Sequence, residues 1–294
     1  MVLLKYNELM KFRFYKYQGA GNDFLIADNR DGSIVLSTDQ IAAICDRRYG
    51  VGADGLMLLE NCDGYDFRMV YYNSDGSGGM MCGNGGRCIV AFAADRGIGS
   101  FRFIAADGPH YAEIVSDDGV QKIVRLQMKD VDVCRYHGRL EGVNIPSEGC
   151  FLDTGTRHFV RIVESVEDCD VVSEGREIRY NASELQPVGA NVNFVEPSDG
   201  FIKVRTYEKG VEDETFACGT GIVASCIAAY KSGIRPSEIN GTEIRYDVAA
   251  KRDSLSVCFK SSSRSVGVVE DVYLTGPARY VAEIEISLRN LYYI

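Results

Sequence analysis

Two cysteines, Cys82 and Cys218, occupy equivalent places in the sequence, and their type and spacing indicate chemistry more directly than any other residues. Each begins a Cys-Gly-x-Gly turn that leads into an apolar segment. Segments 67–98 and 203–234 align without a gap at an offset of 136 residues (218 − 82) and share seven identical positions, both cysteines included. A repeat of strand, turn, cysteine and buried helix predicts a protein built from two related halves.

A cysteine at the start of a helix is suited to acid–base chemistry. An ordinary thiol has a pKa of about 8.5 and is mostly protonated at neutral pH. A partly buried helix N-terminus contributes up to about 2 kcal/mol, or about 1.5 pKa units, in favour of the thiolate. A paired thiolate and thiol supply the base and the acid that inversion at a carbon requires.

The glycines after each cysteine let backbone amides approach an anion, so both helix starts are suited to binding a carboxylate. When an amino acid loses its α-proton, negative charge develops on that carboxylate, and the amides stabilise it. The pattern therefore predicts inversion of an amino acid without pyridoxal phosphate or any other cofactor. Taken singly, a cysteine at a helix start is more often structural than catalytic, and only the pair in equivalent frames favours function.

Composition narrows the possible partners. The net charge of −10 and the pI near 4.9 disfavour nucleic acid and anionic membrane surfaces as partners. The 294 residues contain no long uncharged run, and the first fourteen show no secretory signal, so we expect no membrane span. Residues 1–9 are interpreted as an extension ahead of a second possible start at Met10.

Cysteine and histidine usage bears on compartment and metals. Ten cysteines without an export signal indicate a reducing compartment, and the cytoplasm is the expected location. With three histidines and no Cys-x-x-Cys, we expect no metal site. The eight cysteines outside the repeat position are interpreted as structural: Cys45, Cys62, Cys88, Cys134, Cys150, Cys169, Cys226 and Cys258.

Local patterns predict the elements that position the two cysteines. Ser37 and Gln40 form a capping box for a helix that ends near Arg48. The G-x-G-x-x-G match at 50–55 follows a helix and precedes a strand, so it is not a dinucleotide fingerprint. Helices are predicted over 85–96 and 221–231. Strands are predicted over 11–18, 24–28, 56–60, 66–73, 101–106, 111–115, 122–128, 159–163, 191–196 and 201–207.

Two predictions concern connections. Segment 129–150 lacks clear periodicity and is interpreted as the crossover between halves, and Gly276-Pro277 is interpreted as a last turn. The fold class is α+β, with two pseudo-symmetric domains. Each domain is a mostly antiparallel, barrel-like sheet wrapped around a buried central helix.

The sequence resembles the diaminopimelate epimerase family from Met10 to about Ile286. The motifs that carry the resemblance are Gly21-Asn22-Asp23-Phe24, Gly52-Ala53-Asp54-Gly55, Tyr72-Asn73-Ser74-Asp75-Gly76, Met81-Cys82-Gly83-Asn84-Gly85, Asn191-Val192-Asn193-Phe194, Tyr207-Glu208-Lys209-Gly210 and Ala217-Cys218-Gly219-Thr220-Gly221. The resemblance implies interconversion of LL- and meso-diaminopimelate in lysine and peptidoglycan-precursor biosynthesis, and a homodimer. It also implies an N-terminal domain of residues 10–128 plus 276–294 and a C-terminal domain of residues 129–275.

The same resemblance assigns roles to individual residues. Cys82 and Cys218 are the expected acid/base pair. The backbone amides expected to hold the reacting α-carboxylate are those of Gly83, Asn84, Gly219 and Thr220. The side chains expected to hold the ammonium groups and the distal end of the substrate are Asn22, Asn73, Asn191, Glu208 and Lys209. His158 and Glu208 are candidates for tuning the thiols.

Each polar residue also has a structural interpretation. An asparagine beside glycine is commonly a turn residue, Glu208 and Lys209 fit a solvated hairpin, and Asp54 and Asp75 are interpreted as closing Asx-type turns. His158 also fits a structural residue with its hydrogen bonds satisfied.

Two departures from the family pattern concern the distal end of the substrate. Lys209 stands where the family has arginine. Lysine keeps the positive charge but cannot form the two parallel hydrogen bonds that arginine makes to a carboxylate. Gly155-Thr156-Arg157-His158 stands where the family has Gly-Asn-Pro-His, and Arg157 is either a compensating cation or a surface residue.

Other functions remain open on the sequence alone. A racemase of another amino acid on the same fold is one alternative. Proline racemases typically have Cys-Gly-His where this chain has Cys82-Gly83-Asn84, and relatives with a carboxylate in place of the cysteines are excluded. A redox-sensing or ligand-binding protein with a reversible disulfide is the alternative from another class.

Overall fold

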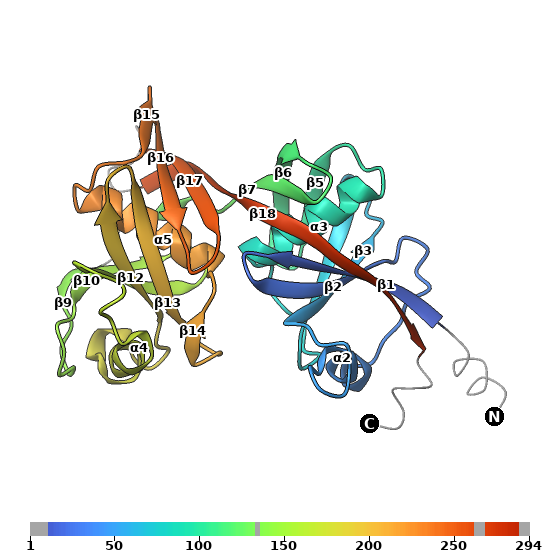
Figure 1. Cartoon of the computed structure of the whole chain (residues 1–294), viewed down its shortest axis with the longest axis horizontal. Helices are drawn as coiled ribbons and strands as arrows, with labels where there is room; N and C mark the ends of the chain where they lie inside the picture. The colour runs from blue at the N-terminus through green and yellow to red at the C-terminus, as the bar shows by residue number, and fades with distance from the viewer. Residues whose placement is uncertain (1–10, 133–135, 262–267, 288–294) are drawn as a thin grey trace. The chain divides into compact units, whose positions relative to one another are not determined.

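The computed structural model describes residues 11–132, 136–261 and 268–287. The predicted extension over residues 1–9, the possible start at Met10 and Cys134 lie outside this range. The chain divides into two compact units (Figure 1). The first contains the residues up to Leu126 and those from Pro277 onward, and the second contains Gln127–Gly276.

The first unit is a sheet wrapped around one helix, α3 (Gly83–Asp95). Its strands are β1 (Lys11–Gly19), β2 (Asn22–Asp28), β3 (Gly55–Glu60), β4 (Phe67–Asn73), β5 (Phe101–Ala105), β6 (Gly108–Asp117) and β7 (Gln121–Gln127). A shorter helix, α2 (Thr38–Cys45), packs on the outer side of the sheet through Ile41 and Ile44, which join an apolar cluster with Leu25 and Leu56.

The second unit repeats this plan around helix α5 (Gly219–Lys231). Its strands are β8 (Val131–Asp132), β9 (Tyr136–Arg139), β10 (Glu148–Asp153), β11 (Arg157–Ile162), β12 (Asn191–Ser198), β13 (Phe201–Glu208), β14 (Asp213–Thr215), β15 (Glu238–Asn240), β16 (Glu243–Ala249) and β17 (Ser254–Ser261). Helix α4 (Val171–Asn181) covers β12 and β13, and the 3₁₀ turn η1 (Ser183–Leu185) follows it. The last strand, β18 (Val268–Ser287), pairs with β17 and then with β1.

Burial of the two central helices explains their composition. All eleven residues of α3 from Gly83 to Ala93 are buried, and nearly the whole of α5 from Gly219 to Ala229 is buried as well. Neither helix has a polar face, because strands surround each of them. The predicted α+β architecture of two barrel-like sheets, each around a buried helix, is therefore confirmed.

Local signals placed most elements correctly, and the differences come from long-range pairing. The capping box at Ser37 and Gln40 is present, but α2 ends at Cys45, with Asp46 as its C-cap, rather than near Arg48. The interpretation of 129–150 as a crossover is wrong, because this segment contains β8, β9 and the start of β10.

Gly276-Pro277 is not a turn. Strand β18 is continuous through both residues, pairing with β17 up to Thr275 and with β1 from Arg279 onward. The proline lies between these two ladders, so its missing N–H removes no hydrogen bond from either of them.

Strand order brings the polar motifs of each unit to one edge. In the first unit β2 runs parallel to β3, and β3 runs antiparallel to β4, so the start of β2, Gly55 and Asn73 share an edge. In the second unit β11 runs parallel to β12, and β12 runs antiparallel to β13. His158 and Asn191 are partners in that register, near the end of β13.

Candidate active site

The first cysteine lies at the N-terminus of the buried helix of its unit. Cys82 is the N-cap of α3, and its Sγ accepts a hydrogen bond from the Gly85 amide at 3.2 Å. A donor aimed at sulfur favours the thiolate over the thiol. The amides of the first helical residues, which begin with Gly83 and Asn84, have no preceding carbonyl within the helix. The residue that could be deprotonated thus lies beside donors that can bind an anion.

Two predicted binding residues of this unit, Asn22 and Asn84, contact each other. The Asn84 side-chain amide donates to Asn22 Oδ1 at 3.5 Å, and Asn84 itself is only 4% exposed. Arg87, fully buried one turn further along α3, donates to Asn84 Oδ1 at 2.9 Å and to the carbonyls of Gly83 and Pro277. Arg87 therefore fixes which end of the Asn84 amide faces Asn22. Sequence reasoning missed this residue, because an arginine on an apolar helix carried no motif of its own.

Asn22 is also held from the other side, by Asp54. The Asn22 side-chain amide and the Asp23 backbone amide both donate to Asp54 Oδ2. Arg47 forms ion pairs with Asp54 at 2.6 Å and with Asp23 at 2.5 Å, and Lys16 pairs with Asp23 at 2.7 Å. Desolvation by burial would raise the pKa of Asp23, but Arg47 and Lys16 outweigh it and lower that pKa. The interpretation of Asp54 as the closure of a local Asx turn is wrong, because its carboxylate orients a predicted binding residue 32 positions away.

Asn73 lies at the same sheet edge, opposite Gly55, and its side-chain amide donates to Ser77 Oγ at 3.0 Å. Asp75 accepts from the Ser77 amide and hydroxyl, which is the predicted Asx-type turn. The loop before Cys82 is thus organised by short-range bonds.

The second cysteine occupies the matching place in its unit. Cys218 is the N-cap of α5, is 8% exposed, and has its Sγ 3.5 Å from Thr220 Oγ1. The Thr220 hydroxyl also lies 3.0 Å from His158 Nε2 and 3.0 Å from Thr156 Oγ1. The Thr220 carbonyl accepts from Thr154 at 3.0 Å. The predicted residues Cys218, Thr220 and His158 therefore form one cluster.

His158 is fully buried in this cluster, and desolvation lowers the pKa of its imidazole to about 3. The ring is therefore uncharged at neutral pH. Its influence on Cys218 can come only through hydrogen bonds and not through a positive charge.

Asn191 connects the predicted residues at the end of β13. Its Oδ1 accepts from the Lys209 amide at 2.8 Å, and its Nδ2 donates to the Arg157 carbonyl at 3.2 Å. Asn191 is 6% exposed, whereas Lys209 is exposed. Glu208 is half-buried at the end of β13, and its carbonyl accepts from the Glu212 amide at 2.8 Å.

Glu212 anchors the loop that carries Glu208 and Lys209. Its carboxylate pairs with Arg179 at 2.7 Å, and it accepts from the Tyr207 hydroxyl at 2.8 Å and the Gly210 amide at 2.9 Å. Arg179 is the main reason that the pKa of Glu212 falls to about 2. Sequence reasoning missed this residue because its partner, Arg179, lies on α4, a helix that no local pattern predicted.

We expect Glu212→Gln to make the free energy of unfolding less dependent on pH in the acid range. A carboxyl whose folded-state pKa lies below its unfolded value of about 4.3 stabilises the fold fully above that value, and this contribution is lost as pH falls towards 2. The variant should lose stability at neutral pH, and its free energy of unfolding should change less than that of the wild type between pH 5 and about 2. Urea titrations across this range measure the difference, and parallel curves for both proteins would contradict the assignment.

Arg157, one of the departures from the family pattern, is held within its own unit. Its guanidinium donates to the Leu185 carbonyl at 3.2 Å and lies 5.0 Å from the centre of the Phe151 ring. These contacts account for the side chain without a substrate carboxylate.

Burial raises the pKa of several other cysteine thiols. It does so for Cys88 and Cys226, which are fully buried on the two central helices, and for Cys169. The pKa of Cys45 rises to about 12, again mainly through burial. These thiols stay protonated at neutral pH, as structural cysteines do.

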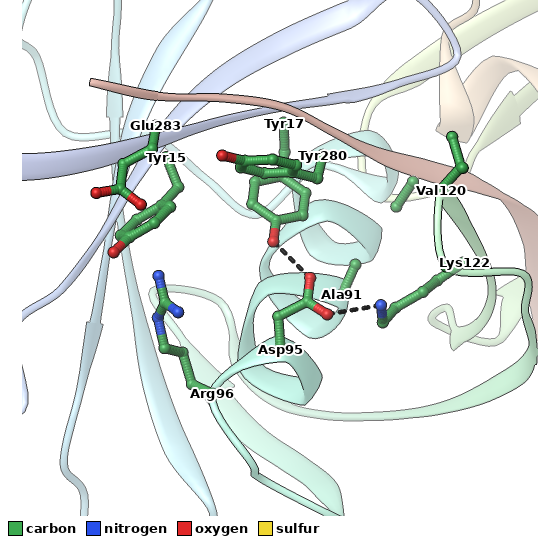
Figure 2. Close-up of a pocket in the computed structure, with 11 residues that line it drawn as sticks. Tyr15, Tyr17, Ala91, Asp95, Arg96, Val120, Lys122, Tyr280 and Glu283 are labelled. Carbon is green, nitrogen blue, oxygen red and sulfur yellow. Dashed lines mark hydrogen bonds and ion pairs between the residues drawn. The ribbon is translucent and has the colours of Figure 1, made fainter.

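A cavity of about 290 Å³ in the first unit lies outside both cysteine clusters (Figure 2). Its lining includes Tyr15, Tyr17, Tyr280 and Asp95, and Asp95 accepts from Tyr17 at 2.6 Å and pairs with Lys122 at 2.7 Å. No predicted site residue lines it. The Asp95 contacts tie β1, α3 and β7 together, which is a structural role.

The part of the chain that the structure describes contains neither a membrane-spanning helix nor a metal-binding cluster. Within residues 11–132, 136–261 and 268–287, no helix has the length and apolarity needed to cross a membrane. Over the same ranges, no group of three or more histidine, cysteine, aspartate or glutamate residues could hold a metal ion.

Comparison with known proteins identifies the family. A sequence profile described as Diaminopimelate epimerase matches residues 14–132 and 150–281, which is more than half of the chain. The chain belongs to the diaminopimelate epimerase family. A relative named diaminopimelate epimerase from Flavobacterium psychrophilum is 44% identical over 93% of this chain and 100% of its own length. Another of that name from Aquifex aeolicus is 38% identical, over 95% and 99%.

Solved structures of other activities share the fold. A phenazine biosynthesis protein of the PhzF family from Bacillus anthracis superimposes with a TM-score of 0.72 at 14% identity, covering 95% of this chain and 99% of that one. A probable proline racemase from Agrobacterium radiobacter gives 0.67 at 14% identity, covering 94% and 93%. At these identities the likeness concerns the fold alone.

Proposed function

We propose that this protein is an isomerase that interconverts LL- and meso-diaminopimelate in lysine and peptidoglycan-precursor biosynthesis. The observation that carries the proposal is family membership at up to 44% identity along nearly the whole chain, with a cysteine N-cap on the buried helix of each unit. No other function considered for the sequence accounts for both features together.

In the proposed reaction, Cys82 and Cys218 act as an acid/base pair on the α-carbon without a cofactor. One thiolate removes the α-proton, and the other thiol delivers a proton to the opposite face. The sulfur of Cys82 already accepts from Gly85, and that of Cys218 lies beside the Thr220 hydroxyl. Hydrogen bonds of this kind favour the thiolate that a base requires.

The proposed carboxylate site consists of backbone amides at the two helix starts, from Gly83, Asn84, Gly219 and Thr220. Charge that develops on the α-carboxylate during proton removal is bound more tightly than the ground state, which lowers the barrier. The proposed ligands of the ammonium groups and the distal end are Asn22, Asn73, Asn191, Glu208 and Lys209. Asn22 donates to Asp54, and the Lys209 amide donates to Asn191, so these two hydrogen bonds hold three of the proposed ligands in place.

We further propose two epimerase domains, residues 10–128 plus 276–294 and residues 129–275. The division of the chain into two compact units after Leu126 and after Gly276 supports these domains. The family resemblance also favours a homodimer, and ten cysteines favour a reducing compartment, the cytoplasm. Sedimentation equilibrium of the reduced protein tests the dimer: a mass of about 32.4 kDa at micromolar concentration would contradict it.

Chiral chromatography tests the substrate assignment. We expect freshly reduced protein to convert LL-diaminopimelate to the meso isomer and to leave proline and hydroxyproline unchanged. Turnover of one of these instead would assign the protein to the racemase alternative. In that case the fold and the acid/base roles of the two thiols would be retained, and the roles proposed for the residues at the distal end of the substrate would be wrong.

We expect oxidation to abolish activity reversibly. The chemistry needs one thiolate and one thiol, so a disulfide or a sulfenic acid at either cysteine removes the base or the acid. Treatment with diamide should stop epimerisation, and dithiothreitol should restore it in full. A protein that shows no turnover in either redox state would instead support the redox-sensing alternative.

A further inference from the structure

A chain of hydrogen bonds lies behind Cys218 in the second unit. From the sulfur it passes to Thr220 Oγ1 at 3.5 Å, which lies 3.0 Å from both Thr156 Oγ1 and His158 Nε2. Thr156 Oγ1 is itself 2.9 Å from His158 Nε2. On the far side of the ring, His158 Nδ1 lies 3.1 Å from Asn193 Nδ2. The direction in which this chain donates decides what reaches the sulfur.

Asn193 sets that direction because its own orientation is fixed. Its Nδ2 lies 3.2 Å from the Phe159 carbonyl, a group that can only accept, so the nitrogen end of the amide must face it. The Oδ1 at the other end accepts from the Thr206 hydroxyl at 2.9 Å. Asn193 and His158 are fully buried and Thr206 is 2% exposed, so water does not compete for these bonds.

The second N–H of the Asn193 amide points at His158 Nδ1, which must therefore accept. A neutral imidazole that accepts at Nδ1 carries its proton on Nε2. Protonation at Nδ1 would set two donors against each other, which agrees with the low pKa that burial gives this ring. The Nε2–H group then faces the two threonine hydroxyls.

We propose that Asn193 is a positioning residue that fixes His158 as the Nε2–H tautomer, and that this tautomer turns the Thr156 and Thr220 hydroxyls so that a donor faces the Cys218 sulfur. In this arrangement Nε2–H donates to Thr156, Thr156 to Thr220, and Thr220 to Cys218. Each proton is used once, and every acceptor is filled.

The consequence is an environment that favours the thiolate form of Cys218. A hydroxyl that donates to sulfur stabilises the thiolate relative to the thiol. Only the use of this thiolate as a catalytic base rests on the proposed function. The tautomer and the reactivity of Cys218 are properties of the protein itself and can be measured without turnover.

NMR of the protein with ¹⁵N-labelled histidine tests the tautomer directly, since the chain has only three histidines. We expect one ring, identified by its loss in His158→Gln, to show a protonated Nε2 and an unprotonated Nδ1 across the neutral range. In Asn193→Asp, whose carboxylate can only accept, the proton should move to Nδ1. A wild-type ring protonated at Nδ1, or at both nitrogens, would overturn the proposal.

Alkylation by iodoacetamide at neutral pH, followed for the Cys218 peptide by mass spectrometry, tests the relay. Thr220→Val removes the hydroxyl that donates to the Cys218 sulfur. Loss of a hydrogen bond to a charged group should slow alkylation about 10- to 100-fold in this variant and in His158→Leu. Thr220→Ser, which keeps the hydroxyl, and His158→Gln, whose amide N–H can replace Nε2–H, should stay within about threefold of wild type.

Ser225→Ala is the matched control, because it removes another buried hydroxyl from the same helix, one that donates to the Gly221 carbonyl at 2.7 Å. Its Cys218 should react at the wild-type rate. A wild-type rate in Thr220→Val, a change of nearly equal shape at a half-buried position, would overturn the relay. So would equal losses in His158→Gln and His158→Leu. If the alkylation rates are as expected but the protein turns over no amino acid, the proposed function is wrong and this inference still holds.

Discussion

Replacing either Cys82 or Cys218 by alanine should reduce epimerisation by about 10²- to 10⁴-fold, the range that a positioned acid or base contributes. The loss should fall on kcat rather than on KM, because the backbone amides proposed to bind the carboxylate are unchanged in both variants. Both variants should keep the wild-type melting temperature within a few degrees, since Cys82 is half-buried and Cys218 lies at a helix end.

The matched controls are the cysteines further along the same helices. Cys88→Ala and Cys226→Ala remove fully buried thiols whose raised pKa keeps them protonated. We expect lower melting temperatures and unchanged activity per folded molecule. If the Cys82 and Cys218 variants instead kept more than about a tenth of wild-type kcat, neither thiol would be the acid or base.

Gly221→Ala should impair both stability and activity. A Cβ at this position would lie 2.4 Å from Asn193 Oδ1, 3.2 Å from His158 Cε1 and 3.3 Å from Cys218 Cβ. The Asn193 oxygen cannot move away without breaking its bond to Thr206. Overpacking of a buried site costs about 1–3 kcal/mol. A shift of the cysteine by a fraction of an ångström should lower kcat by about 10- to 100-fold.

Gly99→Ala is the comparison for this substitution, because a Cβ at that exposed glycine meets no atom within 4 Å. Thermal unfolding and initial rates of both variants should separate them clearly. A Gly221→Ala protein with wild-type melting temperature and kcat would show that the packing of His158, Asn193 and Cys218 is looser than the geometry indicates.

The features predicted correctly from the sequence are those that a few neighbouring residues determine. The capping box at Ser37 and the two Cys-Gly-x-Gly turns each lie within a few residues, so the helix that each one begins can be predicted without knowledge of the fold. The repeat at an offset of 136 residues then predicted two similar units, and both are present. The Gly-rich match at 50–55 was correctly rejected from its context, since β3 follows it directly.

The features that sequence analysis missed depend on partners far along the chain. Asp54 was interpreted as a local turn residue, whereas it binds Asn22 and Arg47. Gly276-Pro277 has the composition of a turn, yet the residues on either side of it pair with β17 and β1, which hold it extended. The roles of Arg87 and Asn193 follow from which strand packs beside which helix, and no local pattern contains that information.

The two-cysteine mechanism is tested most directly by measuring where deuterium appears, in the product or in the remaining substrate, during the first turnovers in deuterium oxide. Proton NMR should follow LL-diaminopimelate with freshly reduced protein while most substrate remains. If two thiols act on opposite faces, the meso product should carry deuterium at its inverted centre while the remaining LL substrate keeps its α-proton. Substrate proton carried into the product, or deuterium appearing equally in the recovered LL substrate, would contradict a two-cysteine mechanism.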